Sequence, residues 1–439
     1  MQSTSTQPIQ TKRPGIAALR AFQTPSYRNL MIASSLSMTA MAMMNLARGW
    51  LVLTLTDSPF WLGLTVALGG LPMLFFSMVG GVIADRFSRR KVLITGEVVN
   101  CCLYALLALL VFTDVVQVWH VLVISLLSGM AFAMIMPSRQ SLVPTLVPRE
   151  DLANAVALMT STFSLSMMVG PALAGVAVAV LDIPGTFTLA SLAVIPAIVT
   201  LSRLQTPPNV GLQANPLQNL LEGLRYTRDD PFIRSLLMMG AVITLFTGPR
   251  EALMPVLARD VLHAGSEGLG VLLGSGGAGA LAGSLIMASM ASGTGQRKLM
   301  AGAGIFAGVA ISGLALSPWF PLSAVFAALC GLSTQMFFTA NVTAVQMAVP
   351  DELRGRVLSI RMIMFGLAPV GAMAAGAVAE LIGAPYTLVG GGALCVALGL
   401  MMIRRYPALR GAEEAPLGNH PSPVLVASAS SQNQLGSAD

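Results

Sequence analysis

The sequence predicts an all-α protein that crosses a membrane many times, and three observations lead to that fold class. Of its 439 residues, 55% are hydrophobic and only 10% are charged, whereas soluble domains carry about 25% charged residues. The mean hydropathy is +0.75. Four stretches contain no charged side chain and are long enough to span a bilayer: residues 58–84, 115–138, 152–181 and 268–296. This composition excludes a water-soluble enzyme.

Twelve apolar segments, separated by charged or Gly/Pro-rich breaks, are the predicted spans. The ninth and tenth are separated where Pro318 and Pro321 interrupt an uncharged run, because both prolines cannot continue one helix. The spans lie near residues 29–55, 58–84, 91–113, 116–137, 152–181, 184–202, 232–258, 267–291, 298–316, 320–347, 356–382 and 385–404. The expected organisation is an N-terminal arm (1–28), a six-helix bundle (29–202), an inter-bundle loop (203–231), a second six-helix bundle (232–405) and a disordered tail (406–439).

The basic residues predict the orientation of the chain. Of the 25 Lys and Arg residues, 22 lie on one side if both termini are placed there, and the exceptions are Arg48, Arg250 and Arg259. The positive-inside rule makes that side cytoplasmic. We therefore expect a multi-pass protein of the cell (inner) membrane with both termini in the cytoplasm. The net charge of +6 then reflects topology, and no nucleic-acid partner is expected.

The two halves of the chain resemble each other at nearly constant offsets. Residues 169–175 match 370–376, with Gly170 and Gly175 on Gly371 and Gly376, and Arg48 falls on Arg250. A second block of matches pairs Gly63, Gly69 and Gly70 with Gly270, Gly276 and Gly277. Two six-span halves in the same orientation imply parallel repeats with a binding site at their interface. Rocking one half against the other would expose that site to each side of the membrane in turn.

The segment between the second and third spans carries a specific motif. Residues 81–93 read Gly-Val-Ile-Ala-Asp-Arg-Phe-Ser-Arg-Arg-Lys-Val-Leu. This segment resembles the G-x-L-a-D-r-x-G-r-k-x-x-l loop of the major facilitator superfamily, with Ser88 in place of the second glycine. The resemblance implies the major facilitator fold and a conformational latch between the halves on the cytoplasmic face. The latch positions are Gly81, Asp85, Arg86, Arg89 and Arg90; the alternative is that the basic residues serve topology alone.

A second motif favours export. Residues 166–175 resemble the fifth-span motif G-x-x-x-G-P-x-x-G-G, which is associated with antiporters, through Gly170, Pro171 and Gly175. The fourth-span arginine of the efflux subfamilies is absent, since residues 116–137 contain no Arg and Arg139 is expected at the cytoplasmic end. Over its length the chain most resembles the branch that holds enterobactin-type siderophore exporters and macrolide-efflux-like proteins.

Charged side chains at membrane depth are costly and therefore candidates for function. Arg48 and Arg250 hold equivalent places in spans one and seven, which line the central cavity in this superfamily. We expect them, with Asn45 and Glu251, to attract an anionic or carbonyl-rich group of the substrate. The alternative is that each arginine snorkels outward or makes a structural ion pair.

Two glutamates are candidates for proton coupling. Glu97 lies in span three with Asn100 one turn deeper on the same face, and a buried carboxylate suits a proton site; the alternative is pairing with the basic loop nearby. Glu380, near the outer end of span eleven, is the weaker candidate. Three aspartates at outer turns are expected to be solvated: Asp57, Asp114 and Asp182.

Together these features predict a secondary active transporter that works by alternating access, namely proton-coupled efflux of amphipathic drugs, siderophores or secondary metabolites. Uptake of a small nutrient is the alternative, and a polytopic membrane enzyme is a remote one because the three histidines are scattered. No cofactor and no metal site are expected. The expected partners are a small-molecule substrate, protons and the lipid bilayer, with the protein acting as a monomer.

Overall fold

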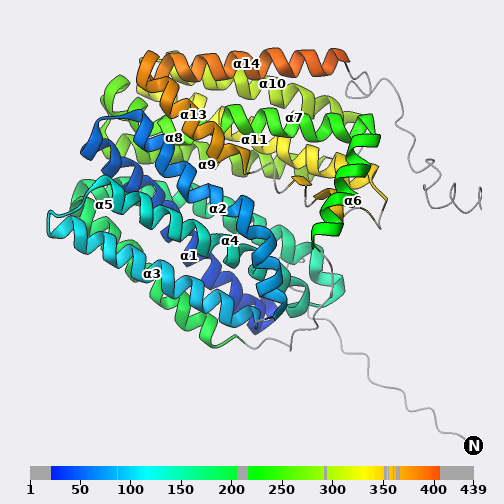
Figure 1. The fold of residues 1–439 in the computed structure, drawn as a ribbon, viewed down its shortest axis with the longest axis horizontal. Coiled ribbons are helices and arrows are strands. Elements are labelled where there is room, and N and C mark those ends of the chain that lie inside the picture. Colours follow the sequence, from blue (N-terminus) through cyan, green and yellow to red (C-terminus); the bar gives the residue numbers. More distant parts are fainter. Residues whose placement is uncertain are drawn as a thin grey trace, which may run out of the picture.

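A computed structural model describes residues 21–86, 88–204, 216–290, 294–350, 353, 355–358, 360–361 and 366–405, and every regular element among them is helical (Figure 1). In chain order these are α1 (Pro25–Thr56), α2 (Pro59–Arg86), α3 (Arg89–Phe112), α4 (Val118–Leu146), η2 (Arg149–Asp151), α5 (Leu152–Ser202), α6 (Pro216–Asp229), α7 (Pro231–Thr247), α8 (Pro249–Val256), η3 (Leu257–Val261), α9 (Gly265–Ser289), α10 (Thr294–Leu316), α11 (Phe320–Ala348), α13 (Leu367–Ile382) and α14 (Ala384–Arg405).

The starts of these helices follow from simple rules. Several begin on a proline, whose fixed φ and missing N–H suit the first turn, as at Pro25, Pro59 and Pro231. The carboxylate of Asp230 caps α7 by accepting hydrogen bonds from the backbone N–H groups of Phe232 and Ile233, at 2.8 and 3.1 Å. The cap satisfies two N–H groups that the helix itself leaves free.

The helices confirm the predicted fold class. Among the described residues, nine helical segments are long and apolar enough to cross a membrane. One of them, α5, contains two spans, because Asp182 interrupts it with φ 58° and ψ −179°. Two shorter apolar segments, Pro59–Phe75 in α2 and Leu367–Ile382 in α13, supply the rest of the twelve.

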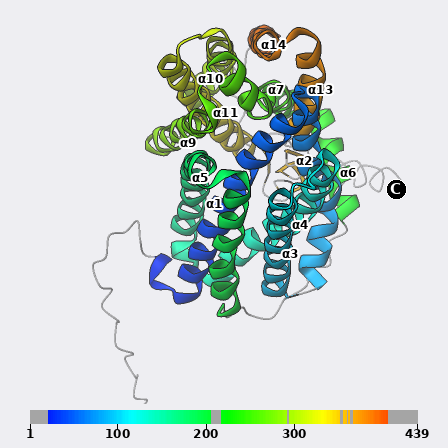
Figure 2. The same ribbon diagram turned by 90° about the vertical axis from the view of Figure 1, so that its left-hand side faces the viewer.

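Helices α1–α5 form the first bundle and α7–α14 the second. Figure 1 shows the second bundle above the first, and Figure 2, which looks along the helices, shows α9 beside α5 and α13 beside α2. Each bundle has its own packed interior: Leu93, Ile135 and Leu142 belong to one core cluster, and Ile243 and Phe337 to another. A third and larger core cluster contains residues of both bundles, such as Leu46 and Leu253, so the two bundles share apolar packing where they meet, chiefly along α5–α9 and α2–α13.

One end of the bundles, here called the distal end, is made of tight turns. Asp57, Asp114, Asp182 and His263 all have positive φ there, a region that aspartate tolerates better than most residues. The three aspartates thus lie at turns, as the sequence predicts. The opposite end is called the α6 end, because α6 crosses it there (Figure 1).

Two elements differ from the expected ones. The loop predicted over 203–231 contains the amphipathic helix α6, whose leucines recur at Leu217, Leu220, Leu221 and Leu224; Glu222 of this helix makes an ion pair with Arg356.

Helix α4 continues through Pro137 and Pro144 to Leu146 instead of ending near residue 137. Burial of Leu142 and Val143, both 1% exposed, offsets the hydrogen bonds that the two prolines cannot make. The N-terminal arm ends earlier than expected, since α1 begins at Pro25, and the tail after residue 405 lies outside the described residues.

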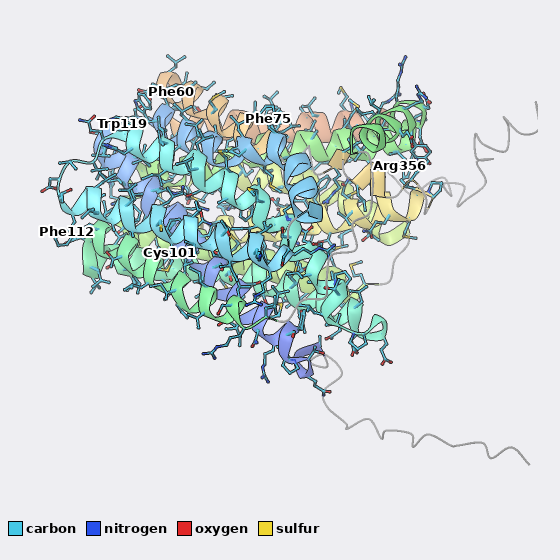
Figure 3. The ribbon with its side chains drawn as sticks, turned by 60° about the horizontal axis from the view of Figure 1, so that its bottom comes forward. Phe60, Phe75, Cys101, Phe112, Trp119 and Arg356 are labelled. Atoms are coloured by element: carbon cyan, nitrogen blue, oxygen red, sulfur yellow. The ribbon has the colours of Figure 1, made fainter. Side chains whose placement is uncertain are left out.

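The outer surface of the bundles is apolar. Phe75, Phe112 and Trp119 are 69%, 77% and 54% exposed and project outward along the bundle in Figure 3. Exposed aromatic and aliphatic side chains in such number would be an aggregation hazard in water. They are the surface expected of a protein whose solvent is lipid.

The two bundles touch through glycines that belong to the sequence repeat. A Cβ added at Gly63 of α2 would lie 3.0 Å from the Cα of Gly376 in α13, and a Cβ at Gly270 of α9 would lie 3.0 Å from the Cα of Gly175 in α5. Gly63 and Gly270 are repeat equivalents, and so are Gly175 and Gly376. The two crossings are therefore the same contact made twice, which allows the backbones to approach as closely as small residues permit.

Candidate substrate and proton sites

The guanidinium group of Arg48 is buried inside the first bundle. Its side chain donates hydrogen bonds to Ser125 Oγ of α4 at 3.2 Å, to the carbonyl of Met44 at 3.4 Å and to Asn45 Oδ1. Arg48 is 8% exposed, whereas its neighbour Asn45 is exposed. Three acceptors offset the cost of burying a charge, so Arg48 is well accommodated without a carboxylate.

Arg250 of α8 is less well accommodated. Its Nη2 lies 3.5 Å from Glu251 Oε1, but its buried Nη1 has no hydrogen-bond partner. The absence of a side chain at Gly276 of α9 makes room for it, since a Cβ there would lie 3.0 Å from Nη1. At the offset that places Arg48 on Arg250, Ser125 corresponds to Ala327, which lacks the hydroxyl that Arg48 uses. The second arginine therefore keeps a free hydrogen-bond donor where the first has a partner.

The partners of each arginine come from its own bundle. Arg48 reaches α4, and Arg250 reaches into the space beside Gly276 of α9 and Ala327 of α11. Glu251 is 71% exposed although it lies within the span Pro231–Val261. That Arg48 and Arg250 face each other across a shared cavity remains a prediction.

Glu97 makes a buried ion pair that the sequence does not reveal. Its carboxylate accepts a hydrogen bond from Arg139 Nη2 of α4 at 3.0 Å, and the two side chains are 3% and 4% exposed. Ser37 of α1 lies beside the same carboxylate. The sequence predicts Arg139 at the cytoplasmic end, but α4 continues past Pro137 and carries it into the protein. The signal for this pair is the spacing of Ser125, Ser128 and Arg139 along one face of a continued helix.

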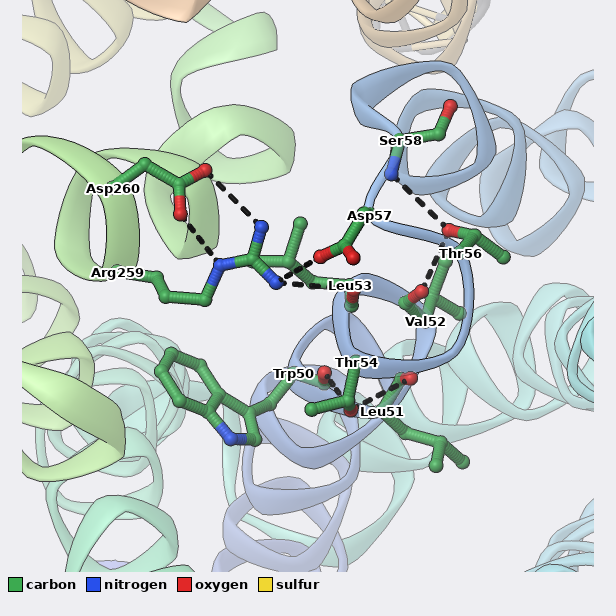
Figure 4. A network of polar contacts seen from close by, with 10 residues as sticks. All are labelled: Trp50, Leu51, Val52, Leu53, Thr54, Thr56, Asp57, Ser58, Arg259 and Asp260. Atoms are coloured by element: carbon green, nitrogen blue, oxygen red, sulfur yellow. Dashed lines mark hydrogen bonds and ion pairs between the residues drawn. The ribbon is translucent and has the colours of Figure 1, made fainter.

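A polar network joins the bundles at the distal end. Arg259 of η3 donates to Asp57 Oδ1 at 2.6 Å and to the carbonyl of Leu53 at 3.3 Å, while Asp260 holds the same guanidinium group from its own side (Figure 4). Asp57 is 79% exposed, as expected, but it is ion-paired. Sequence patterns assign no function to Arg259, because a partner 202 positions away leaves no local signal.

Glu380 belongs to a second contact at the same end. Its Oε2 accepts hydrogen bonds from Ser58 Oγ at 2.7 Å and from the backbone N–H of Phe60 at 3.3 Å. The carboxylate of α13 thereby meets the N-terminus of α2, where the helix dipole favours negative charge. The structure thus places this proton-coupling candidate between the two bundles.

The loop motif is described in part. Gly81, Asp85 and Arg86 belong to α2, but their side chains lie outside the described residues. Arg89 donates to the carbonyl of Ser141 at 2.9 Å, and Arg90 donates to the carbonyl of Ser202. Both arginines thus tie the start of α3 to its own bundle. The latch between the halves remains a prediction.

The fifth-span motif lies at a junction of three helices. A Cβ added at Gly170 would lie 2.5 Å from Ala42 Cβ of α1, and one at Gly270 of α9 would lie 2.8 Å from the carbonyl oxygen of Pro171. Gly175 makes the close inter-bundle crossing with Gly270. The three motif residues therefore let α5 pack tightly against α1 on one side and α9 on the other.

Comparison with known proteins gives a consistent result. Residues 16–434 match the family described as transmembrane secretion effector. Macrolide efflux protein A of Streptococcus pyogenes is 26% identical over 359 residues, which cover 79% of this chain and 88% of that protein. The enterobactin exporter EntS of Citrobacter koseri is 26% identical over 340 residues, which cover 76% of this chain and 80% of that one.

Two solved structures share the fold at low sequence identity. A point mutant of the nucleoside transporter NupG has a TM-score of 0.72 at 13% identity, over 87% of this chain and 100% of that one. A bacterial homologue of the human lysosomal transporter Spinster, in an inward-facing and occupied conformation, has a TM-score of 0.70 at 13% identity, over 90% and 99%. The family match over residues 16–434, together with the repeat and the helices, shows that the chain is a membrane transporter of the transmembrane secretion effector family of the major facilitator superfamily.

Proposed function

We propose that this transporter exports amphipathic small molecules across the inner membrane in exchange for protons. Both curated relatives described above carry export or efflux in their names. The positive-inside rule supports an orientation with the α6 end and both termini in the cytoplasm and the distal end outside. In this orientation the conformation is sealed on its outer face by Arg259–Asp57 and Glu380–Ser58.

The observation that carries the proposal is the buried ion pair of Glu97 and Arg139. A carboxylate that is 3% exposed is stabilised as an anion by the arginine, and binding of a proton removes that attraction. The two protonation states therefore favour different packing of α3 against α4. At the offset that places Arg48 on Arg250, Arg139 corresponds to Asn341, so the second bundle has no arginine at this position and coupling is assigned to the first.

Substrate binding is assigned to Arg48, Asn45, Arg250 and Glu251. The unpartnered Nη1 of Arg250 is a donor that a carbonyl or anionic oxygen would satisfy, since a buried donor without a partner costs free energy. The exposed Glu251 beside it suits a cationic or hydroxyl group. A molecule that carries both kinds of group on an apolar frame fits this pair.

Vesicle transport tests the direction and the coupling. Everted membrane vesicles that contain the full chain are expected to accumulate radiolabelled erythromycin, as a macrolide probe, when the lumen is acidified, and a protonophore is expected to stop it. Accumulation in right-side-out vesicles instead would favour the uptake alternative. Enterobactin serves as the second probe. If neither probe is transported, the proposed substrate class is wrong.

Replacing both Arg48 and Arg250 with Gln is expected to abolish transport of the probe while the protein is still made and inserted. Glutamine keeps hydrogen-bonding capacity but removes both positive charges from the assigned binding region. The exposed Arg404→Gln at the end of α14 is the matched control and should transport normally. Full activity in the double variant would exclude these arginines from substrate binding.

Reversing the charge of Arg259 is expected to weaken the outer seal. Arg259→Asp places a third carboxylate beside Asp57 and Asp260, and Asp57→Arg in the same chain restores an opposite pair. Because partly exposed ion pairs contribute about 1 kcal/mol or less, the single variant should slow transport by less than about tenfold. Initial transport rates check this, with Glu267→Gln, a charge change at an exposed position of α9, as the control, and failure of the second change to restore the rate would count against the seal.

A further inference from the structure

The interior of the first bundle contains polar atoms that neither the ion pair nor the arginine site uses. Asn100 Oδ1, Ser128 Oγ and Ser34 Oγ are buried and have no hydrogen-bond partner. Each of these atoms needs a partner, since nearly all buried polar atoms are hydrogen-bonded to the protein or to ordered water. They belong to α1, α3 and α4, and the last two of these helices carry the Glu97–Arg139 ion pair.

Two of these atoms lie between Glu97 and Arg48. Asn100 and Tyr104 follow Glu97 by three and seven residues, so all three share one face of α3, and at 1.5 Å per residue they cover about 10 Å along the helix. Tyr104 is 2% exposed and lies within electrostatic range of both Arg48 and Glu97. The face is therefore a row of polar side chains, here called the strip, that leads along α3 from the carboxylate toward the arginine.

Helix α4 supplies the opposite side of the strip. Ser125 accepts the hydrogen bond of Arg48, Ser128 lies about one turn nearer the α6 end, and Arg139 follows on the same face and reaches Glu97. On α1, Ser34 lies one turn from Ser37, which is beside the Glu97 carboxylate. Unpartnered oxygens thus occur on both sides of Glu97 along the bundle axis.

We propose that α1, α3 and α4 enclose a chain of ordered water molecules that joins Arg48 to the Glu97–Arg139 ion pair and carries protons to Glu97. Water supplies the hydrogen bonds that Asn100, Ser128 and Ser34 lack, as buried water does for other unsatisfied groups. The exposed Asn45 beside Arg48 marks the end at which the chain meets the substrate region. A proton moves along the water to a Glu97 carboxylate oxygen and later leaves by the same water, so no other donor is needed.

The second bundle shows that this strip is not a general property of the repeat. At the offset that places Arg48 on Arg250, Ser125 and Ser128 correspond to Ala327 and Cys330, and Arg139 corresponds to Asn341. Asn341 is satisfied by a hydrogen bond to the carbonyl of Leu236 at 2.9 Å. The hydrated strip therefore belongs to the first bundle, which also holds the ion pair, and its use as a proton path rests on the proposed function.

Hydroxyl-radical footprinting of the full chain in lipid nanodiscs tests the water directly and needs no substrate. Tyr104 is expected to be modified several-fold faster than Tyr27, a tyrosine that is also buried but whose hydroxyl donates to the carbonyl of Ala155 at 2.7 Å. Asn100→Leu, which removes the polar wall, is expected to bring Tyr104 down to the rate of Tyr27. Equal rates for both tyrosines in the unaltered protein would overturn the proposal.

Transport separates this proposal from the function on which its use rests. Asn100→Leu is expected to lose accumulation of erythromycin driven by a pH gradient in everted vesicles, while exchange of labelled for unlabelled erythromycin continues. If Tyr104 is modified rapidly but transport by the unaltered protein does not respond to the gradient, proton coupling is contradicted. The proposal of internal water would still stand. A gradient response that survives Asn100→Leu would exclude the strip as the proton path.

Discussion

Replacing Glu97 with Gln is expected to abolish the response of transport to a pH gradient while exchange of substrate across the membrane continues. Glutamine can still accept the hydrogen bond from Arg139 Nη2, so the helices should stay packed. It has no proton to exchange, so the two packing states no longer depend on pH. The comparison of gradient-driven accumulation with exchange in vesicles measures this, and unchanged accumulation would remove Glu97 from the coupling mechanism.

Changing Arg139 separates coupling from stability. Arg139→Leu leaves the Glu97 carboxylate buried without a counter-charge, which is expected to cost about 3–5 kcal/mol. Glu97→Leu combined with Arg139→Met removes both charges and should recover most of that stability, because an apolar pair of similar volume replaces a buried ion pair at little cost. The double variant is still expected to be uncoupled, since stability returns but the proton site does not.

An exposed ion pair in the same chain is the matched control for stability. Arg356 and Glu222 are 34% and 37% exposed, so Arg356→Leu is expected to cost about 1 kcal/mol or less. In detergent, the unfolding temperature of Arg139→Leu should therefore be well below those of Arg356→Leu and of the double variant. Equal unfolding temperatures for both single variants would show that the buried pair contributes nothing special.

The fold is predictable because its determinants are local or periodic. Apolar length sets the spans, Pro318 and Pro321 mark a break, and the repeat fixes two equivalent bundles. Helix geometry alone places Glu97 and Asn100 on one face. Such features need no knowledge of which helix lies beside which.

The missed residues have partners far away in sequence. Arg139 and Glu97 are 42 positions apart, and Glu380 and Ser58 are 322 positions apart; no spacing rule joins residues at such separations. Pro137 predicts the end of a span because proline weakens a helix, but packing of Leu142 overcomes that preference. Tertiary contacts, absent from a single sequence, decide both the length of α4 and the partner of Glu97.

Filling the inter-bundle crossings is expected to hold the transporter away from the conformation seen here. A Cβ at Gly63 would lie 2.5 Å from the carbonyl oxygen of Ala372, and one at Gly175 would lie 2.8 Å from the carbonyl oxygen of Ser266. The backbone of a packed helix cannot yield as a flexible side chain can, so Gly63→Ala forces the bundles apart at the distal end. Overpacking of this kind costs about 1–3 kcal/mol, which shifts the balance between closed and open states by roughly five- to 150-fold.

Labelling from outside the membrane measures that shift. In a background with the four native cysteines replaced by Ser, Asn45→Cys should react slowly with a membrane-impermeant thiol reagent added outside, and Gly63→Ala should raise the rate. Gly302→Ala is the matched control, because no atom lies within 4 Å of a Cβ added there. Since Gly270 makes the equivalent crossing in the other repeat, Gly270→Ala should reproduce the effect of Gly63→Ala. An effect at one position only would mean that the two crossings, although built from equivalent residues, do not bear equally on closure of the distal end.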